Sequence, residues 1–140
     1  MRPAFGSEAL NAQALAPAGE LAGRVLLALL FVLEGLSKLG AYDAAARYVA
    51  AFGLTPYLLP LAIVLELGAG ILVMLGWHTR IAALALAGFC VAAALIFHTR
   101  FGDRNQLIHF EKDLALAGAF LVLAARGAGR FSLDAARARG

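Results

Sequence analysis

Apolar residues fall into four long runs along the chain, separated by short polar stretches. The runs cover residues 21–39, 57–76, 81–98 and 106–125. Each is close to the roughly 20 helical residues that cross the hydrocarbon core of a bilayer. Because backbone N–H and C=O groups in lipid must bond within their own segment, each run predicts a transmembrane helix. The pattern therefore predicts an all-α fold, an integral membrane four-helix bundle.

Residues 41–56, between the first two runs, follow a different pattern. Tyr48 and Phe52 fall on one side of a helix, and Asp43 and Arg47 fall on another. An apolar face opposite a charged face is typical of a helix that lies in the membrane interface. We therefore predict a short interfacial helix between spans one and two.

The composition leaves little room for a soluble domain. Of the 140 residues, 62% are apolar and 15% are charged, whereas soluble domains are roughly half apolar and a quarter charged. We divide the chain into a flexible N-terminal tail (residues 1–20), a four-span membrane domain (residues 21–125) and a basic C-terminal tail (residues 126–140). The net charge of +3 comes from residues at the ends of spans and gives no reason to expect nucleic-acid binding.

The arginines and lysines predict the orientation of the bundle. Four spans place both termini on one side of the membrane. That side carries Arg2, Arg24, Arg80, Arg126, Arg130, Arg137 and Arg139. The opposite side carries Lys38, Arg47, Arg100, Arg104 and Lys112. Because the side richer in basic residues stays in the cytoplasm, we predict that both termini are cytoplasmic.

Glu66 lies in the middle of the second run. A carboxylate at the centre of a membrane helix costs about 2.5–3.5 kcal/mol on insertion scales, so it is expected to have a partner or a task. Gly70 lies one turn later on the same face, where a neighbouring helix can approach closely and bring a partner group. The alternative is a protonated glutamate that makes one interhelical hydrogen bond.

Two further polar groups lie near the non-cytoplasmic ends of their spans. Glu34 and Lys38 are four residues apart on the first span, where an intrahelical ion pair forms readily. A pair that merely neutralises itself and eases insertion is the alternative. On the fourth span His109 and Asp113 have the same spacing, and a hydrogen bond between them would fix the imidazole tautomer.

These groups predict a polar pocket that opens toward the outer face, with Glu66 as its floor. The candidate proton-handling residues are Glu66, His109 and Glu34. The remaining predicted pocket residues are Lys38, His98, Gln106, Lys112 and Asp113. Ionisable residues inside a membrane are functional candidates by default, although a polar layer that only specifies helix packing remains the alternative.

No motif for a resident metal or cofactor is present. His98 and His109 lack the spacing of two metal ligands on one helix, and no facing pair of histidines indicates haem. Cys90, the only cysteine, cannot form an intrachain disulfide and is expected to be a packing residue. We therefore predict no metal site and no built-in cofactor.

Three stretches of the chain resemble the DoxX family of small bacterial membrane proteins. They are GRVLLALLFVLEGLSKL at residues 23–39, LELGAGILVMLGWHTR at residues 65–80, and the set FH, NQ and KDLA at residues 97–98, 105–106 and 112–115. The closing GRFSLD at residues 129–134 is also similar. Asp113 departs from the family pattern, which commonly has Asn at this position.

The resemblance implies a four-helix bundle in a bacterial inner membrane. Relatives are associated with quinol oxidase and thiosulfate:quinone oxidoreductase complexes or with thiol-redox assemblies. We therefore predict a membrane subunit of a redox-associated complex, with a quinone or a small sulfur compound in the pocket. His109, Gln106 and Lys38 would donate hydrogen bonds to quinone carbonyls. No electron-carrier motif is visible, so a redox partner protein would be required.

Two other functions stay open at this point. A non-catalytic scaffold would anchor a partner through the arginine-rich tail, and a small proton-linked carrier would need a homo-oligomer. The sequence does not decide whether the chain is an enzyme, because function depends on the site and not on the fold.

Overall fold

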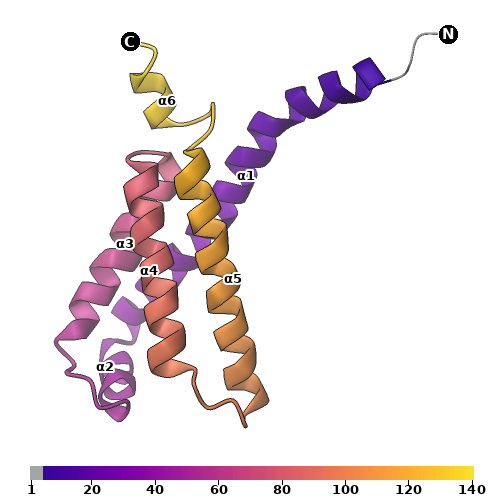
Figure 1. Ribbon diagram of the computed structural model, residues 1–140. Coiled ribbons are helices and arrows are strands. Elements are labelled where there is room, and N and C mark those ends of the chain that lie inside the picture. The colour runs from indigo at the N-terminus through magenta and orange to yellow at the C-terminus, as the bar shows by residue number, and fades with distance from the viewer. Residues whose placement is uncertain (1–4) are drawn as a thin grey trace.

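The computed structural model describes the backbone of residues 5–140 and the side chains of residues 12–140. It confirms the all-α prediction, and the described chain contains no strand (Figure 1). The helices are α1 (Phe5–Gly40), α2 (Tyr42–Ala51), α3 (Leu58–Leu75), α4 (Thr79–Phe97), α5 (Arg104–Arg126) and α6 (Leu133–Arg137).

Three of these helices are long and apolar enough to cross a membrane: α1 over Ala12–Gly40, α3 and α4. The fourth long helix, α5, completes the bundle beside α4 and is polar in its first turns. Large apolar side chains such as Leu26, Val64 and Ile81 are about two-thirds exposed on the outer faces. Water would oppose that exposure, whereas lipid chains satisfy it, so the chain is an integral membrane protein.

Helix packing runs in the order α1, α3, α4, α5, with antiparallel α4 and α5 in the most extensive contact. Phe31 and Phe120 meet edge to face, with 5.3 Å between ring centroids, and join α1 to α5. Beyond this pair the two helices separate toward the end of the bundle that carries α2 (Figure 1). The bundle is therefore closed in its middle and splayed between α1 and α5 at one end.

The expected tail over residues 1–20 differs from the structure. Helix α1 already begins at Phe5 and continues through Pro17 without interruption. This stretch lacks an apolar run, but it is rich in alanine, and the high helix propensity of alanine favours continuation of the span. Residues 1–4 lie outside the described residues. The C-terminal tail also contains a helix, the short α6.

The interfacial helix predicted for residues 41–56 corresponds to α2, and none of its residues is buried. Its aromatic face packs on the end of α4. Tyr48 and Phe52 lie 5.6 Å and 5.0 Å from Phe97 between ring centroids. The guanidinium of Arg100 lies 5.7 Å from the centre of the Phe52 ring. These contacts place α2 across the splayed end of the bundle.

Both termini lie at the opposite end of the bundle (Figure 1). Arginine side chains hold the helix ends together there. Arg24 is buried and donates hydrogen bonds to the carbonyl oxygens of Ala128 and Phe131, the second at 2.7 Å. Arg80 donates to the carbonyl of Ala125 at 2.7 Å and also reaches Ala124 at 2.9 Å. These arginines satisfy carbonyl groups at and beyond the end of α5 that would otherwise have no helical partner.

Asp134 ties α6 to the start of α4. Its carboxylate oxygens accept hydrogen bonds from the backbone amides of His78 (2.9 Å) and Thr79 (3.0 Å). Partial burial would raise the pKa of Asp134, but hydrogen bonds from the Thr79 and His78 amides outweigh it and lower the pKa. Asp134 thus serves as the N-terminal cap of a helix distant in sequence.

Two glycines allow α1 and α3 to approach closely. A Cβ added to Gly35 would lie 2.6 Å from Cγ of Leu67, and one added to Gly70 would lie 3.1 Å from Cγ2 of Val32. Small residues at such crossings let helix backbones come together, which van der Waals packing then stabilises. The crossing lies next to the polar groups of both helices, Glu34 and Glu66.

We expect Asp134→Ala to lower the free energy of unfolding by about 1 kcal/mol at neutral pH, the usual cost of losing a helix cap. Because the folded pKa is lower than the ordinary value of 3.8, the stabilisation is present above that value and is lost as pH falls through the folded pKa. Thermal unfolding in mild detergent at several pH values would measure this. A difference between wild type and variant that does not shrink in acid would contradict the assignment.

We expect Gly35→Ala to destabilise the protein by about 1–3 kcal/mol, because the added methyl group overlaps Leu67. The matched control is Gly68→Ala on α3, because a Cβ added to Gly68 meets no atom within 4 Å. Thermal unfolding in detergent would compare the two variants. Equal stability of both would show that the α1–α3 crossing tolerates expansion.

Candidate functional site

The splayed end of the bundle encloses a cavity of about 430 Å³. Its walls come from α1, α2, α3, α4 and α5, and they are mostly apolar. Aromatic rings from Phe31, Phe89 and Phe97 and the side chains of Leu59 and Leu116 form much of the surface. The size and apolar lining are those of a site for a small organic molecule.

The polar part of this cavity consists of the residues that the sequence singled out, with one exception. The polar lining is Glu34, Lys38, Glu66, His98, His109, Lys112 and Asp113. Gln106 lies outside the lining and contacts His98 instead. The structure thus brings together side chains from α1, α3, α4 and α5, although their chemical role stays a prediction.

Lys38 lies between two carboxylates. Its ammonium group is 3.0 Å from Oε1 of Glu66 and 3.2 Å from Oε2 of Glu34. Glu66 is 3% exposed, whereas Glu34 is 56% exposed, so the two ion pairs differ in environment. The exposed pair contributes little to stability. In the buried pair, the ammonium group of Lys38 compensates the charge of Glu66 in the interior. This contact depends on the close α1–α3 crossing.

Glu66 uses only one of its carboxylate oxygens in this ion pair. Oε2 is buried and makes no hydrogen bond within the described part of the chain. Glu66 lines the cavity, but this oxygen has essentially no accessible surface. A buried acceptor of this kind costs free energy unless something donates to it.

The two histidines stack on one another. The rings of His98 and His109 are 5.0 Å apart between centroids with 23° between their planes. Nδ1 of His98 lies 3.0 Å from Oε1 of Gln106, which makes this nitrogen the donor. Nε2 of His98 lies 3.7 Å from Oδ2 of Asp113, which is too far for a hydrogen bond, and the two groups attract as opposite charges only when the imidazole is protonated.

The predicted hydrogen bond between His109 and Asp113 does not occur among the described residues. The His109 ring instead stacks on His98, and the Asp113 carboxylate faces Nε2 of the same His98. Stacking between helices therefore takes precedence over the contact within one helix. His98, at the end of α4, is the residue that organises this side of the cavity.

Sequence reasoning did not place Cys90 on α4, or Tyr48 and Val49 on α2, in the lining. Cys90 is almost fully buried and was expected only to fill space. The spacing of Cys90, Ala93 and Phe97 follows one helix face, which is the signal that would have linked the cysteine to the cavity. No group of three or more metal-binding side chains occurs within residues that the structure describes.

The cavity is lined by residues of both α1 and α5. Glu34 and Lys38 lie on the α1 side, and Lys112 and Asp113 lie on the α5 side. No extensive packing joins the two helices at this level in the described chain.

The sequence profile of the DoxX family matches residues 19–99. Inner membrane protein YqjF of Escherichia coli (strain K12) is 38% identical over 116 residues, which cover 83% of this chain and 89% of the relative. Inner membrane protein YphA of the same organism is 35% identical over 121 residues, which cover 81% of this chain and 86% of the relative. No solved structure matches the chain.

We expect Lys38→Met to lower the free energy of unfolding by about 3–5 kcal/mol, because it leaves Glu66 buried without a counter-charge. The double variant Lys38→Met with Glu66→Met should recover most of this loss, since two apolar side chains need no partner. Glu34→Gln, which removes only the exposed carboxylate, should change stability by less than about 1 kcal/mol. Chemical unfolding in detergent would measure all three. A double variant that is no more stable than Lys38→Met alone would contradict direct coupling between Lys38 and Glu66.

Proposed function

The chain belongs to the DoxX family of membrane proteins, and from this premise we propose that it is the membrane subunit of a redox-associated complex. Its cavity would bind a quinone-class ligand that enters from the bilayer. The observation that carries the proposal is the cavity itself. It joins apolar, aromatic walls to a cluster of ionisable side chains, and the ligand would enter between α1 and α5, which do not pack extensively against each other in the described chain.

The lining suits the two parts of a quinone. Phe31, Phe89 and Phe97 would contact the ring and the start of the isoprenoid tail. The polar groups would then contact the ring oxygens. Lys38 is already bonded to two carboxylates and Gln106 lies outside the lining, so His109 and Lys112 are the better donors.

Glu66, Glu34 and His109 are the proposed proton-handling groups. Lys38 links the buried carboxylate of Glu66 to the exposed carboxylate of Glu34 through contacts of 3.0 Å and 3.2 Å. This arrangement provides a short route between the cavity and its polar rim. Quinone chemistry couples electrons to protons, and such groups would supply or accept the protons.

A small sulfur anion suits the cavity less well. Three carboxylates face it, from Glu34, Glu66 and Asp113, against the two cations Lys38 and Lys112. The lining therefore has more carboxyl groups than lysines and offers an anion no excess of cationic partners. The aromatic walls also offer no compensation for an anion's lost hydration.

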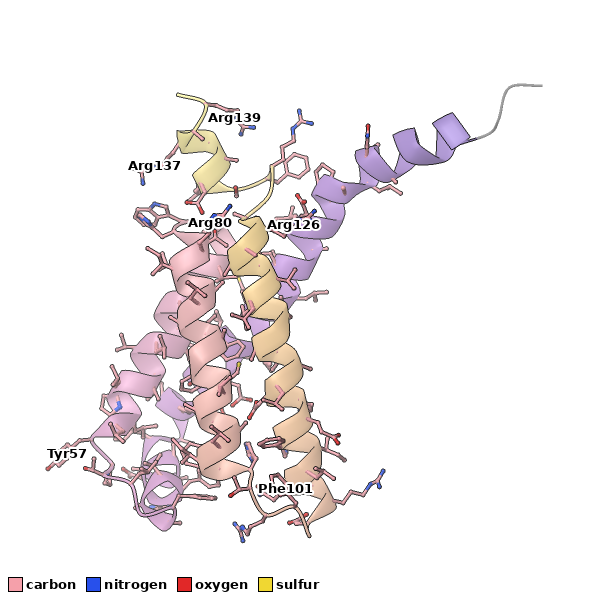
Figure 2. The ribbon with its side chains drawn as sticks, viewed as in Figure 1. Tyr57, Arg80, Phe101, Arg126, Arg137 and Arg139 are labelled. Carbon is pink, nitrogen blue, oxygen red and sulfur yellow. The ribbon has the colours of Figure 1, made fainter. Side chains whose placement is uncertain are left out.

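We further propose that the protein resides in a bacterial inner membrane with both termini in the cytoplasm. The E. coli relatives are named inner membrane proteins. Arg80, Arg126, Arg137 and Arg139 gather at the end of the bundle where both termini lie (Figure 2). Because basic residues favour the cytoplasmic side, the cavity would open near the outer leaflet. A redox partner would supply the electron carrier.

The second candidate function is a non-catalytic scaffold that anchors a partner protein, because one observation favours it. Asp134 anchors α6 to the bundle, which holds Arg137 at a fixed position beside exposed Trp77. A rigid basic surface of this kind could contact an acidic partner. This surface and the cavity lie at opposite ends of the bundle, so their contributions are separable by mutation.

The test is a mild-detergent purification of the tagged protein from its native membranes, with mass spectrometry of co-purifying proteins and lipid-soluble cofactors. We expect wild type to retain a quinone and a redox protein. Glu66→Gln and His109→Ala should lower the retained quinone about tenfold, since charge-assisted hydrogen bonds of this kind are lost. Partner recovery should stay unchanged.

Glu111→Gln is the matched control, because Glu111 is an exposed glutamate of α5 outside the cavity lining. Retention of quinone by Glu66→Gln equal to that of the control would count against the cavity. Loss of the partner in Arg137→Ala, with quinone retention intact, would favour the scaffold.

A further inference from the structure

A second hollow lies at the end of the bundle that carries the termini, between the start of α4 and the end of α5. This α4–α5 groove has a volume of about 440 Å³. Its lining combines the side chains of Arg80 and Arg126 with the apolar side chain of Ile81 and the turn at Gly127. Figure 2 shows both arginines at this end of the two helices. The groove thus has a basic part and an apolar edge, far from the cavity at the other end.

Arg80 uses only part of its guanidinium to hold the fold together. Nη1 donates to the carbonyl oxygens of Ala124 at 2.9 Å and Ala125 at 2.7 Å, and Nη2 lies 3.5 Å from that of Arg126. Because a guanidinium has five N–H donors, Nε and one hydrogen of Nη2 remain for another acceptor. A Cβ added to Gly127 would lie 3.4 Å from Nη2 and 3.6 Å from Nε. The glycine therefore leaves this edge of Arg80 without a covering side chain.

The charges around the groove favour an anion. Arg126 is exposed in the last turn of α5, and its guanidinium makes no hydrogen bond or ion pair with the residues that the structure describes. One carboxylate, that of Asp134, also lines the groove. Its oxygens accept hydrogen bonds from the amides of His78 and Thr79, and the buried Arg24 attracts the same group. The two lining arginines therefore keep charge for a ligand, and guanidinium groups match phosphate oxygens in geometry.

The helix faces that adjoin the groove are apolar and exposed. Ile81, at the edge of the groove, is 71% exposed. Leu84 lies one turn further into the bundle on α4, and Val122 lies one turn before Arg126 on α5. Both are more than half exposed. In a bilayer these faces contact acyl chains, so a molecule held at the two arginines can continue along them with apolar chains of its own.

We propose that the α4–α5 groove binds an anionic phospholipid, with its phosphate at Arg80 and Arg126 and its acyl chains along Ile81, Leu84 and Val122. Basic pockets between membrane helices are suited to acidic headgroups. A free phosphate ester shares the charged group but has no chains for the apolar faces, and an acidic protein segment has none either. The site is independent of the cavity and of the surface at Arg137, because neither contributes to the groove lining.

Native mass spectrometry of the full-length protein, released from detergent micelles, tests this proposal. The protein is titrated with phosphatidylglycerol or with phosphatidylcholine of the same acyl chains, which differ in net headgroup charge. We expect the first phosphatidylglycerol to bind about tenfold more tightly than the first phosphatidylcholine, as charge-assisted hydrogen bonds predict. Glycerol 1-phosphate, the third probe, should not displace phosphatidylglycerol at equal concentration, because it lacks acyl chains.

Arg126→Gln should weaken the binding of phosphatidylglycerol about tenfold and leave that of phosphatidylcholine nearly unchanged. The matched control is Arg139→Gln, which removes the same charge from the same end of the bundle but outside the groove lining (Figure 2). It should bind within about twofold of wild type, because a distant exposed charge is screened.

The comparison of the three probes on wild type needs no variant, so it tests the proposal even where Arg126→Gln fails to fold. Equal binding of the two phospholipids to wild type would overturn it. Equal losses in the two variants would overturn it as well, since net charge alone would then attract the lipid. Displacement of phosphatidylglycerol by glycerol 1-phosphate would replace the lipid site with a site for free phosphate esters.

Discussion

The cost of placing Glu66 inside a membrane bundle constrains much of this structure. The carboxylate is compensated by Lys38 at 3.0 Å, and Lys38 reaches it only because α1 and α3 cross closely at Gly35 and Gly70. The same crossing leaves α1 tilted away from α5 toward the α2 end (Figure 1). One electrostatic requirement thus connects the choice of small residues, the tilt of a span and the opening of the cavity.

The two ends of the bundle use their polar side chains differently. At the end with the termini, Arg24, Arg80 and Asp134 satisfy helix-end carbonyls and amides through side-chain hydrogen bonds. At the other end, ionisable side chains from α1, α3, α4 and α5 meet around a cavity. The first arrangement ties helix ends together, whereas the second gathers groups that can hold charge or move protons.

Sequence reasoning located the helices well because membrane spans have a strong and simple pattern, and the starts and ends of α3 and α4 lie close to the apolar runs. It also selected most of the cavity's polar residues, since ionisable groups in apolar runs are rare. It did not find the pairings. The Lys38–Glu66 contact depends on a crossing between helices, and the His98–His109 stack depends on how α4 and α5 face each other. Side-chain spacing on one helix cannot specify either.

The stretches that resemble DoxX proteins divide between these two ends. Arg24, Arg80 and Asp134 have structural tasks, because each caps or ties a helix end. The cavity residues are where relatives with one fold can differ in chemistry. Position 113 is such a place, since the family pattern commonly has Asn and this chain has Asp. Asn would offer both a donor and an acceptor, whereas the carboxylate offers acceptors alone. Position 113 is therefore one place where the hydrogen-bonding groups around this cavity differ from those of the family pattern.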